Sequence, residues 1–239
     1  MDLVADIHDA LAAHRGERVV VAITGPPGSG KTTIATALMS HLIESLGPAG
    51  VGYLPMDGFH LSNAVLEHLD RRSRKGAPDT FDVDGYVAML HRLRHTEHTI
   101  YAPDFDHSFG EPIAASRTIP ATARLVITEG NYLGLTHGPW AAVGPLLSRL
   151  YYVYASDETR RGRLIRRHVA AGRTPAEAAA WVHDVDDPNA QLIAGTRDRA
   201  DLVIDGSCAL RLPDLDEQIS GRHLRHRRNR HAGNLSADR

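Results

Sequence analysis

A phosphate-binding loop between a buried strand and a helix constrains this chain more than any other feature. The run Gly25-Pro-Pro-Gly-Ser-Gly-Lys-Thr32 matches the pattern Gly-x-x-x-x-Gly-Lys-Thr in full. The apolar stretch 18–24 precedes it and is typical of a strand buried on both faces of a parallel sheet. Residues 32–46 have helical composition and stop at Gly47-Pro48. The context therefore favours a phosphate site over a Gly/Pro turn of purely structural purpose.

Lysine is rare in this chain, which draws attention to the lysine of the loop. Only two of the 27 basic residues are lysines, Lys31 and Lys75. A compact ammonium can bridge the β- and γ-phosphates of a nucleotide, whereas the planar fork of arginine does not fit there. Loop N–H groups and the helix N-terminus hold phosphate oxygens, and the Thr32 hydroxyl is placed for Mg²⁺. We therefore predict ATP and Mg²⁺ as cofactors, bound by Gly25, Pro26, Pro27, Gly28, Ser29, Gly30, Lys31, Thr32 and Thr33.

Strands alternate with helices along the rest of the chain. We expect strands at 18–24, 51–55, 124–128, 150–154 and 201–205, and helices at 3–14, 32–46, 82–95, 157–171 and from Thr174 onward. This alternation predicts an α/β fold, a three-layer P-loop NTPase sandwich whose central sheet is mostly parallel. The stretch 102–119, rich in Asp, Pro and Gly, is predicted to be a long functional loop.

Composition limits the compartment and the partners. No apolar run approaches the roughly 20 residues of a membrane span, the N-terminus is acidic, and Cys208 is the single cysteine. We therefore expect a cytoplasmic protein with no membrane association. The kinase-like domain is assigned to 1–214, and the basic segment 215–239 is expected to be a disordered tail. A nucleic-acid contact through that tail is the alternative, although it lacks aromatic residues that would stack on bases.

Two acids follow predicted strands and precede glycine. Asp57 comes after the strand 51–55, and Glu129 after the strand 124–128. Since the carboxyl ends of parallel strands share one edge, both acids should lie near the phosphate loop. We assign Asp57 as the base that accepts the proton of an acceptor hydroxyl, and Glu129, with Thr32, to the Mg²⁺ shell. Either acid could instead cap a helix.

The predicted helix 157–171 is dense in arginine, and a helix so cationic repels itself unless an anion meets it. We interpret 157–173 as a lid over the polyphosphate, with Arg163 and Arg167 as its catalytic arginines. A solvated helix with counterions is the alternative.

These segments together resemble the phosphoribulokinase/uridine kinase family of P-loop kinases, which includes the bacterial type of pantothenate kinase. The resemblance covers about residues 15–206. Met56-Asp-Gly-Phe-His-Leu-Ser-Asn63 is similar to the pantothenate kinase segment that carries the catalytic aspartate. Tyr101-Ala-Pro-Asp-Phe-Asp-His-Ser108 resembles a nucleoside-contacting segment of uridine kinases, with a shorter Asp104–His107 spacing and a proline in place of tyrosine.

Three further segments resemble a bacterial branch described as nucleoside/nucleotide kinase-like or as fructose import kinase: Arg74–Asp82, Thr128–Tyr132 and Trp181–Ala190. The resemblance implies ATP, Mg²⁺, transfer to a hydroxyl, the Asp57 base and the arginine lid. It leaves a nucleoside, a sugar such as fructose, and pantothenate open as acceptors.

The predicted acceptor side draws on residues from several loops. We expect Asp57, His60, Lys75, Asp79, Asp104 and His107 to face the acceptor. The predicted partners are ATP and a small-molecule acceptor, and a homodimer is compatible with the sequence. A different class of function also fits the phosphate loop, namely a nucleotide-operated switch or assembly NTPase. The Asp57 segment favours the kinase, because a switch needs no acceptor base.

Overall fold

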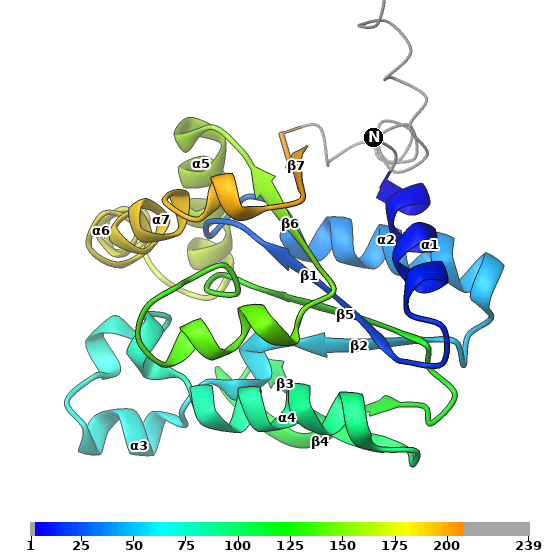
Figure 1. The fold of residues 1–239 in the computed structure, drawn as a ribbon. Coiled ribbons are helices and arrows are strands. Elements are labelled where there is room, and N and C mark those ends of the chain that lie inside the picture. The colour runs from blue at the N-terminus through cyan, green and yellow to red at the C-terminus, as the bar shows by residue number, and fades with distance from the viewer. Residues whose placement is uncertain (1–2, 208–239) are drawn as a thin grey trace, which may run out of the picture.

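Five parallel strands form the central sheet of the computed structural model, which describes residues 3–207 (Figure 1). Their spatial order is β2-β5-β1-β6-β7, and every neighbouring pair is parallel. The strands are β1 (Val19–Thr24), β2 (Val51–Pro55), β5 (Leu125–Gly130), β6 (Arg149–Tyr154) and β7 (Leu202–Asp205). All five predicted strands are confirmed to within two residues at either end.

Helices cover both faces of this sheet, as the apolar periodicity predicts. Helices α1 (Leu3–Ala13) and α2 (Lys31–Leu46) pack on one face, and α4 (Val83–His95) and α7 (Asp187–Ala194) on the other. The remaining α-helices are α3 (Asn63–His68), α5 (Asp157–Ala170) and α6 (Pro175–Trp181). Short 3₁₀ segments are η1 (Met56–Phe59), η2 (Arg72–Arg74), η3 (Pro78–Thr80), η4 (Pro139–Ala142), η5 (Gly144–Leu146) and η7 (Arg197–Arg199), and η6 (Val182–Asp186) is a π-helix. The three-layer α/β fold is thus confirmed.

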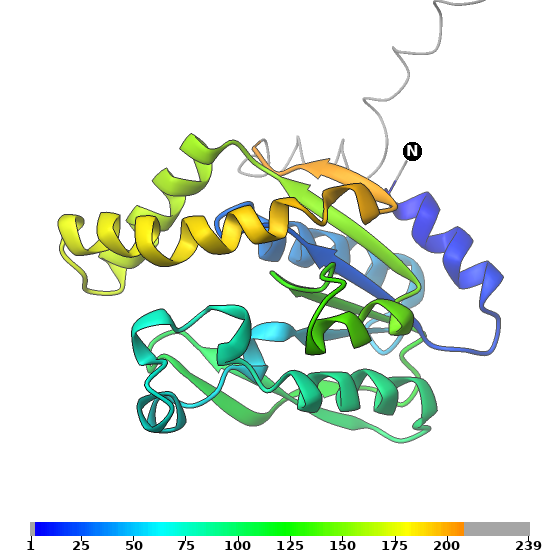
Figure 2. The ribbon, with the colours of Figure 1, turned by 60° about the vertical axis from the view of Figure 1, so that its left-hand side comes forward.

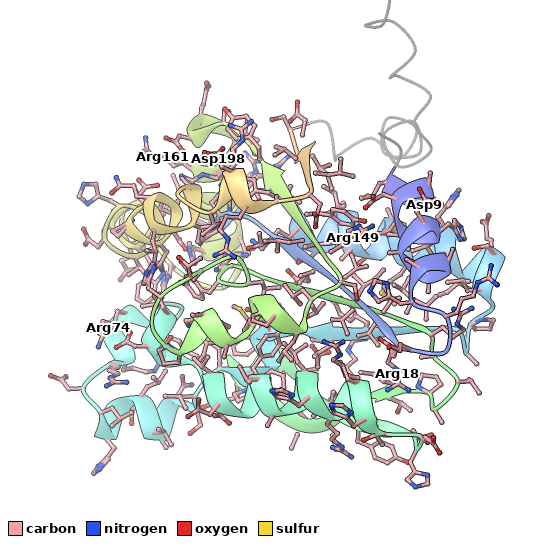
Figure 3. All side chains as sticks on the ribbon, viewed as in Figure 1. Asp9, Arg18, Arg74, Arg149, Arg161 and Asp198 are labelled. Carbon is pink, nitrogen blue, oxygen red and sulfur yellow. The ribbon has the colours of Figure 1, made fainter. Side chains whose placement is uncertain are left out.

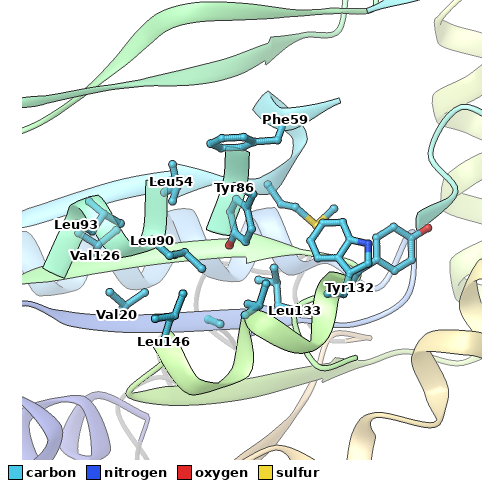
Figure 4. Packing of buried hydrophobic residues seen from close by; sticks show 14 of the residues in the cluster. Val20, Leu54, Phe59, Tyr86, Leu90, Leu93, Val126, Tyr132, Leu133 and Leu146 are labelled. Carbon is cyan, nitrogen blue, oxygen red and sulfur yellow. The ribbon is translucent and has the colours of Figure 1, made fainter. Parts of the chain in front are cut away.

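The alternation of side chains along β1 divides the core in two. Val19, Val21 and Ile23 pack against α1 and α2, whereas Val20 and Ala22 belong to the cluster under α4. All six residues of β1 are buried, which explains why its sequence is a continuous apolar run rather than an alternating one. Figure 4 shows the second cluster, where Val20, Leu54, Leu90, Leu93 and Val126 come together.

The stretch 102–119 is not a long loop, and that prediction is wrong. It forms most of an antiparallel hairpin of β3 (Ile100–Asp106) and β4 (Glu111–Ile119), with a register shift between Ala102 and Asp104. The buried ends Ile100, Ala102 and Ile119 pack into the core, while most of β4 is exposed. The proline and aspartate content that suggested a loop is tolerated because the two strands of this ribbon are hydrogen-bonded only to each other and not to the central sheet.

Helices α5 and α6, and then η6 and α7, follow one another after β6. They project beyond the sheet on the side where its strands end (Figure 2). Thr174 and Glu177 form a reciprocal cap of α6, in which each side chain accepts from the other residue's backbone N–H. The predicted tail 215–239 lies outside the described residues. Within 3–207, no helix is both long enough and apolar enough to cross a membrane.

Candidate active site

The loop between β1 and α2 has the backbone that its glycines predict. Gly30 adopts a positive φ of 103° at the start of α2, a conformation that favours glycine. At Gly28 a Cβ atom would come within 2.8 Å of the Arg160 carbonyl oxygen, so only glycine lets α5 approach the loop this closely. The predicted phosphate-binding residues therefore lie together, between β1 and the first turn of α2.

Lys31 lies within this loop with 8% of its surface exposed. Its ammonium donates to the Pro26 carbonyl oxygen at 3.1 Å, which leaves further N–H groups for a ligand. Burial lowers the pKa of Lys31 to about 8, against the opposing effect of the negative charges of Glu129 and Asp57. The structure thus brings Lys31 within electrostatic reach of both predicted acids.

Glu129 is the most buried acid of the site, at 6% exposure on the end of β5. Its Oε1 accepts from the Thr32 hydroxyl at 3.3 Å and from the Tyr53 hydroxyl at 3.2 Å. Burial, and after it the charge of Asp57, raise the pKa of Glu129 to about 7 against the opposing effect of Lys31. A carboxylate held away from water in this way has a strong demand for a cation.

The oxygens of Thr32 and Glu129 fit a Mg²⁺ ion. A hydroxyl and a carboxylate are hard donors, and a magnesium ion in a nucleotide site takes few protein ligands because phosphates and waters supply the rest. The described residues contain no cluster of three or more His, Cys, Asp or Glu side chains, and such a site requires none. The two residues predicted for the metal shell are therefore adjacent, and they are directly hydrogen-bonded.

Asp57 lies in η1, the single turn that follows β2, with its side chain 38% exposed. Its carboxylate makes no hydrogen bond within the described part of the chain, and its Oδ1 lies 4.0 Å from His60 Nδ1. Its charge also influences the pKa values of Lys31 and Glu129. Asp57 thus lies within electrostatic reach of Lys31 and close to His60, and neither of its carboxylate oxygens has a hydrogen-bond partner within the described residues.

His60 is held by its ring and by the turn that carries Asp57. Its Nδ1 donates to the Asp57 carbonyl oxygen at 2.8 Å, and its ring lies between those of Phe81 and Phe105, with centroids 4.0 and 4.7 Å away. Burial lowers the pKa of His60. The imidazole therefore helps to build a rigid wall beside Asp57.

Lys75, the second lysine, joins three segments beside this wall. Its ammonium donates to Asn63 Oδ1 at 2.7 Å and to the Gly110 carbonyl oxygen at 2.6 Å, and lies 5.2 Å from the Phe105 ring centroid. It thereby fixes the hairpin turn to α3. This contact explains a lysine at this position without requiring that it touch an acceptor.

The other predicted acceptor residues differ in the residues that they contact. His107 occupies the hairpin turn, exposed, with its ring 5.1 Å from that of Phe105. Asp104 accepts from Arg117 Nε at 2.6 Å. Asp79 is exposed and pairs with Arg74, which Figure 3 labels on the surface of the molecule. The structure groups His60 and His107 around Phe105, whereas Asp79 is committed to a surface ion pair.

The arginines of α5 divide into two groups by their partners. Arg163 donates to the carbonyl oxygens of Gly28 and Ser29, both at 3.2 Å, and to that of Gly206 at 2.9 Å. Arg167 is exposed, makes no hydrogen bond or ion pair within residues 3–207, and lowers the pKa of Lys31 through its charge. Arg163 thus holds the outer side of the phosphate loop, and Arg167 is left free beside Lys31.

Three residues of the site were missed at the level of sequence. Arg160 is 3% exposed and donates to the Pro27 carbonyl oxygen at 3.2 Å. Tyr53 bonds Glu129, and Phe105 stacks on His60. The position of Tyr53 within a strand next to the expected metal edge was a usable signal. Nothing in the spacing of α5 links Arg160 to the phosphate loop, because Pro27 lies far away along the chain.

Comparison with known proteins agrees with this geometry. Residues 20–210 match the model of the phosphoribulokinase/uridine kinase family, which is most of the chain. The chain belongs to this family of P-loop kinases. A Schizosaccharomyces pombe protein named as a candidate uridine kinase, C227.14, is 35% identical over 169 residues, covering 69% of this chain and 72% of its own. Escherichia coli YggC is 32% identical over 188 residues, covering 79% and 78%.

Solved structures give the same fold. A Silicibacter sp. TM1040 protein described as a candidate fructose transport system kinase superposes with a TM-score of 0.77 at 32% identity, covering 85% of this chain and 99% of its own. Saccharomyces cerevisiae YFH7 superposes with a TM-score of 0.71 at 19% identity, covering 85% and 97%, and so supports the fold alone.

Proposed function

We propose that this protein transfers the γ-phosphoryl group of ATP to a hydroxyl of a small acceptor, with Asp57 as the general base. The observation that carries the proposal is the place of Asp57, whose unbonded carboxylate lies between Lys31 on the donor side and His60 on the acceptor side. Family membership supports a kinase that uses ATP. The nature of the acceptor and the role of Asp57 as the base go beyond family membership and are the proposed part.

Each group of the site has a role in this reaction. Loop N–H groups and Lys31 hold the phosphates, and Arg167 faces the charge that spreads over the transferring group. Asp57 accepts the proton of the acceptor hydroxyl as the new O–P bond forms and the bond to ADP breaks. Thr32 and Glu129 would hold Mg²⁺, which neutralises charge on the β- and γ-phosphates when bound. Buried Lys31 and Glu129 act in a site where such charges interact strongly.

The acceptor class is drawn from the relatives and from the wall beside Asp57. One relative is named for uridine and one structural neighbour for fructose, so a nucleoside and a sugar are the first acceptors to test, and pantothenate is the third. Phe105 is half-buried beside His60 and gives an acceptor ring an aromatic side chain to contact. This wall favours a nucleoside-like acceptor over an extended chain.

The test is an ATP-consumption screen over nucleosides, sugars, pantothenate and related vitamins, with Asp57→Asn as the blank. Asp57→Asn should bind ATP as well as the wild type does and lose at least about a hundredfold in turnover, the range for one general base. Lys31→Ala should weaken nucleotide binding or abolish transfer. Undiminished transfer by Asp57→Asn would refute the assignment of the base.

A nucleotide-operated switch remains the second candidate, because a phosphate loop with a mobile neighbour suits both functions. It predicts ATP hydrolysis that needs no small acceptor and rises only with a protein partner. In that case Asp57→Asn would leave the hydrolysis rate unchanged. The free carboxylate of Asp57 at the end of β2 favours the kinase.

A further inference from the structure

A cavity lies beside the phosphate loop, between the end of β6, the first turn of α5 and one side of α7. Its volume is about 270 Å³. Its polar lining comprises Asp157, Arg160, Arg161, Asp187, Gln191 and Arg197, and two tyrosines, Tyr152 and Tyr154, complete the aromatic side. Figure 3 labels Arg161, a half-exposed residue at the rim. Apart from the phosphate-loop residue Pro26, none of the residues that face this space has a role in the proposed phosphoryl transfer.

One of the three arginines that line the cavity has no carboxylate partner within the described residues. Arg160 and Arg161 are paired with Asp157 and Asp187, so their charges are largely balanced. Arg197 makes no ion pair within the described residues and lies 4.9 Å from the Tyr154 ring centroid. The lining therefore has three guanidinium groups against two carboxylates and carries an excess positive charge.

Tyr152 supplies a second, independent sign of a ligand. The residue is only 2% exposed, yet its hydroxyl makes no hydrogen bond within residues 3–207. The hydroxyl is not completely enclosed by protein atoms, so it keeps some open surface. Since the residue lines the cavity, the hydroxyl opens into it. A buried hydroxyl without a partner is costly unless water or a ligand satisfies it.

The wall shared with the phosphate loop couples the two sites. Pro26 lines the cavity, and its carbonyl oxygen accepts from Lys31. Arg160 also lines it, and donates to the Pro27 carbonyl oxygen from a position fixed by Asp157 and Asp187. Anything that braces the first turn of α5 against α7 therefore steadies the loop that holds the nucleotide.

We propose that this cavity binds a small organic anion, a carboxylate or a phosphate monoester, on Arg197 and the Tyr152 hydroxyl, and that its binding tightens nucleotide binding. A cavity of about 150 Å³ already admits a benzene ring, so this larger space suits a compact ring or short chain with one anionic group. The alanines Ala190 and Ala194 form an apolar side for the rest of such a molecule. The inference requires that the phosphate loop bind nucleotide, and it is independent of the acceptor and of Asp57.

The test uses the full chain and benzoate, an anion of suitable size with little affinity for a phosphate loop. Calorimetric titrations are run with the loop saturated by ADP and Mg²⁺, and benzyl alcohol serves as the neutral comparison. We expect benzoate to bind and benzyl alcohol to bind at least tenfold more weakly. Arg197→Met should weaken benzoate binding about tenfold, and Tyr152→Phe several-fold, while the neighbouring Arg199→Met should leave it unchanged.

A second titration measures the coupling. Saturating benzoate should lower the Kd for ATP about fivefold in the wild type, at the lower end of ordinary coupling between sites, and should have no effect in Arg197→Met. Benzoate binding that is the same in all three variants, or an ATP Kd that does not respond to benzoate, would overturn the proposal. Neither outcome bears on phosphoryl transfer, which the acceptor screen measures separately.

Discussion

Replacing Glu129 with glutamine should stabilise the nucleotide-free protein while impairing its proposed use of metal. Both hydrogen bonds to the side chain, from Thr32 and Tyr53, reach the same atom, Oε1, and a glutamine oxygen can accept them. The charge is what the fold resists, since burial raises the pKa of Glu129 from 4.5 to about 7. Glutamine keeps the shape and removes the buried charge.

The sign follows from proton binding. Between pH 4.5 and 7 the folded protein holds a proton on Glu129 that the unfolded chain has released, so the stability of the wild type falls as the pH rises through this window. The shift corresponds to on the order of 3 kcal/mol above pH 7, and about 1 kcal/mol is already present at pH 5. Glu129→Gln should escape this cost, less the part lost because Lys31 no longer has its counter-charge.

Urea denaturation with EDTA, at pH 5 and at pH 8, measures this effect. The advantage of Glu129→Gln over the wild type should grow between the two pH values, by up to about 2 kcal/mol. Glu97→Gln, at an exposed carboxylate after α4, is the matched control and should show no such growth. With Mg²⁺ and ADP present the order should reverse. A variant no more stable than the wild type at pH 8 would refute the reasoning.

Four further substitutions, one of them with a matched control, separate the roles of other residues. Arg163→Met leaves the Gly28 and Ser29 carbonyl oxygens of the phosphate loop without this donor, so nucleotide affinity, measured by titration, should fall at least about tenfold. Arg167→Met should keep nucleotide affinity within a few-fold of the wild type and lower turnover, measured in single-turnover assays, about a hundredfold. Gly206→Ala forces a Cβ into the Ser29 carbonyl oxygen and should cost about 1–3 kcal/mol in urea denaturation, whereas Gly144→Ala, whose Cβ would make only an ordinary contact with Arg199, should cost little. Lys75→Met removes two bonds that hold the hairpin turn, so limited proteolysis there should speed up about tenfold without change at other sites.

The parts of the fold that could be predicted are those encoded by local pattern. The loop at Gly25–Thr32 carries its own chemistry, and the buried run of β1 identifies a parallel sheet. Sheet edge geometry then brought Asp57 and Glu129 to Lys31, and the structure agrees. The hairpin 100–119 was missed because Pro103 and Pro112 lie in a ribbon whose strands pair only with each other, where a missing N–H costs little.

The roles of the α5 arginines could not be predicted, because their partners are distant in sequence. The phosphate-loop carbonyl oxygens that Arg160 and Arg163 bind lie 133 to 135 residues away, so spacing along the helix shows only which side chains share a face. The same limit applies to Lys75, whose rarity drew attention but whose partners, Asn63 and the Gly110 carbonyl, were invisible to any local pattern.

The contacts of Arg160 and Arg163 also restrict how α5 can act as a lid. Both arginines bind the backbone of the phosphate loop, and Arg163 binds Gly206 after β7 as well. A rigid swing of the whole helix would break all of these bonds and expose Gly28, which lies against the Arg160 carbonyl. Any closing motion must therefore begin beyond Arg163, in the turns that carry Arg167. A lid at 157–173, as predicted, would combine this anchored first half with a second half that moves together with α6 and η6, because His168 pairs with Asp186 and Arg173 lies over the Trp181 ring.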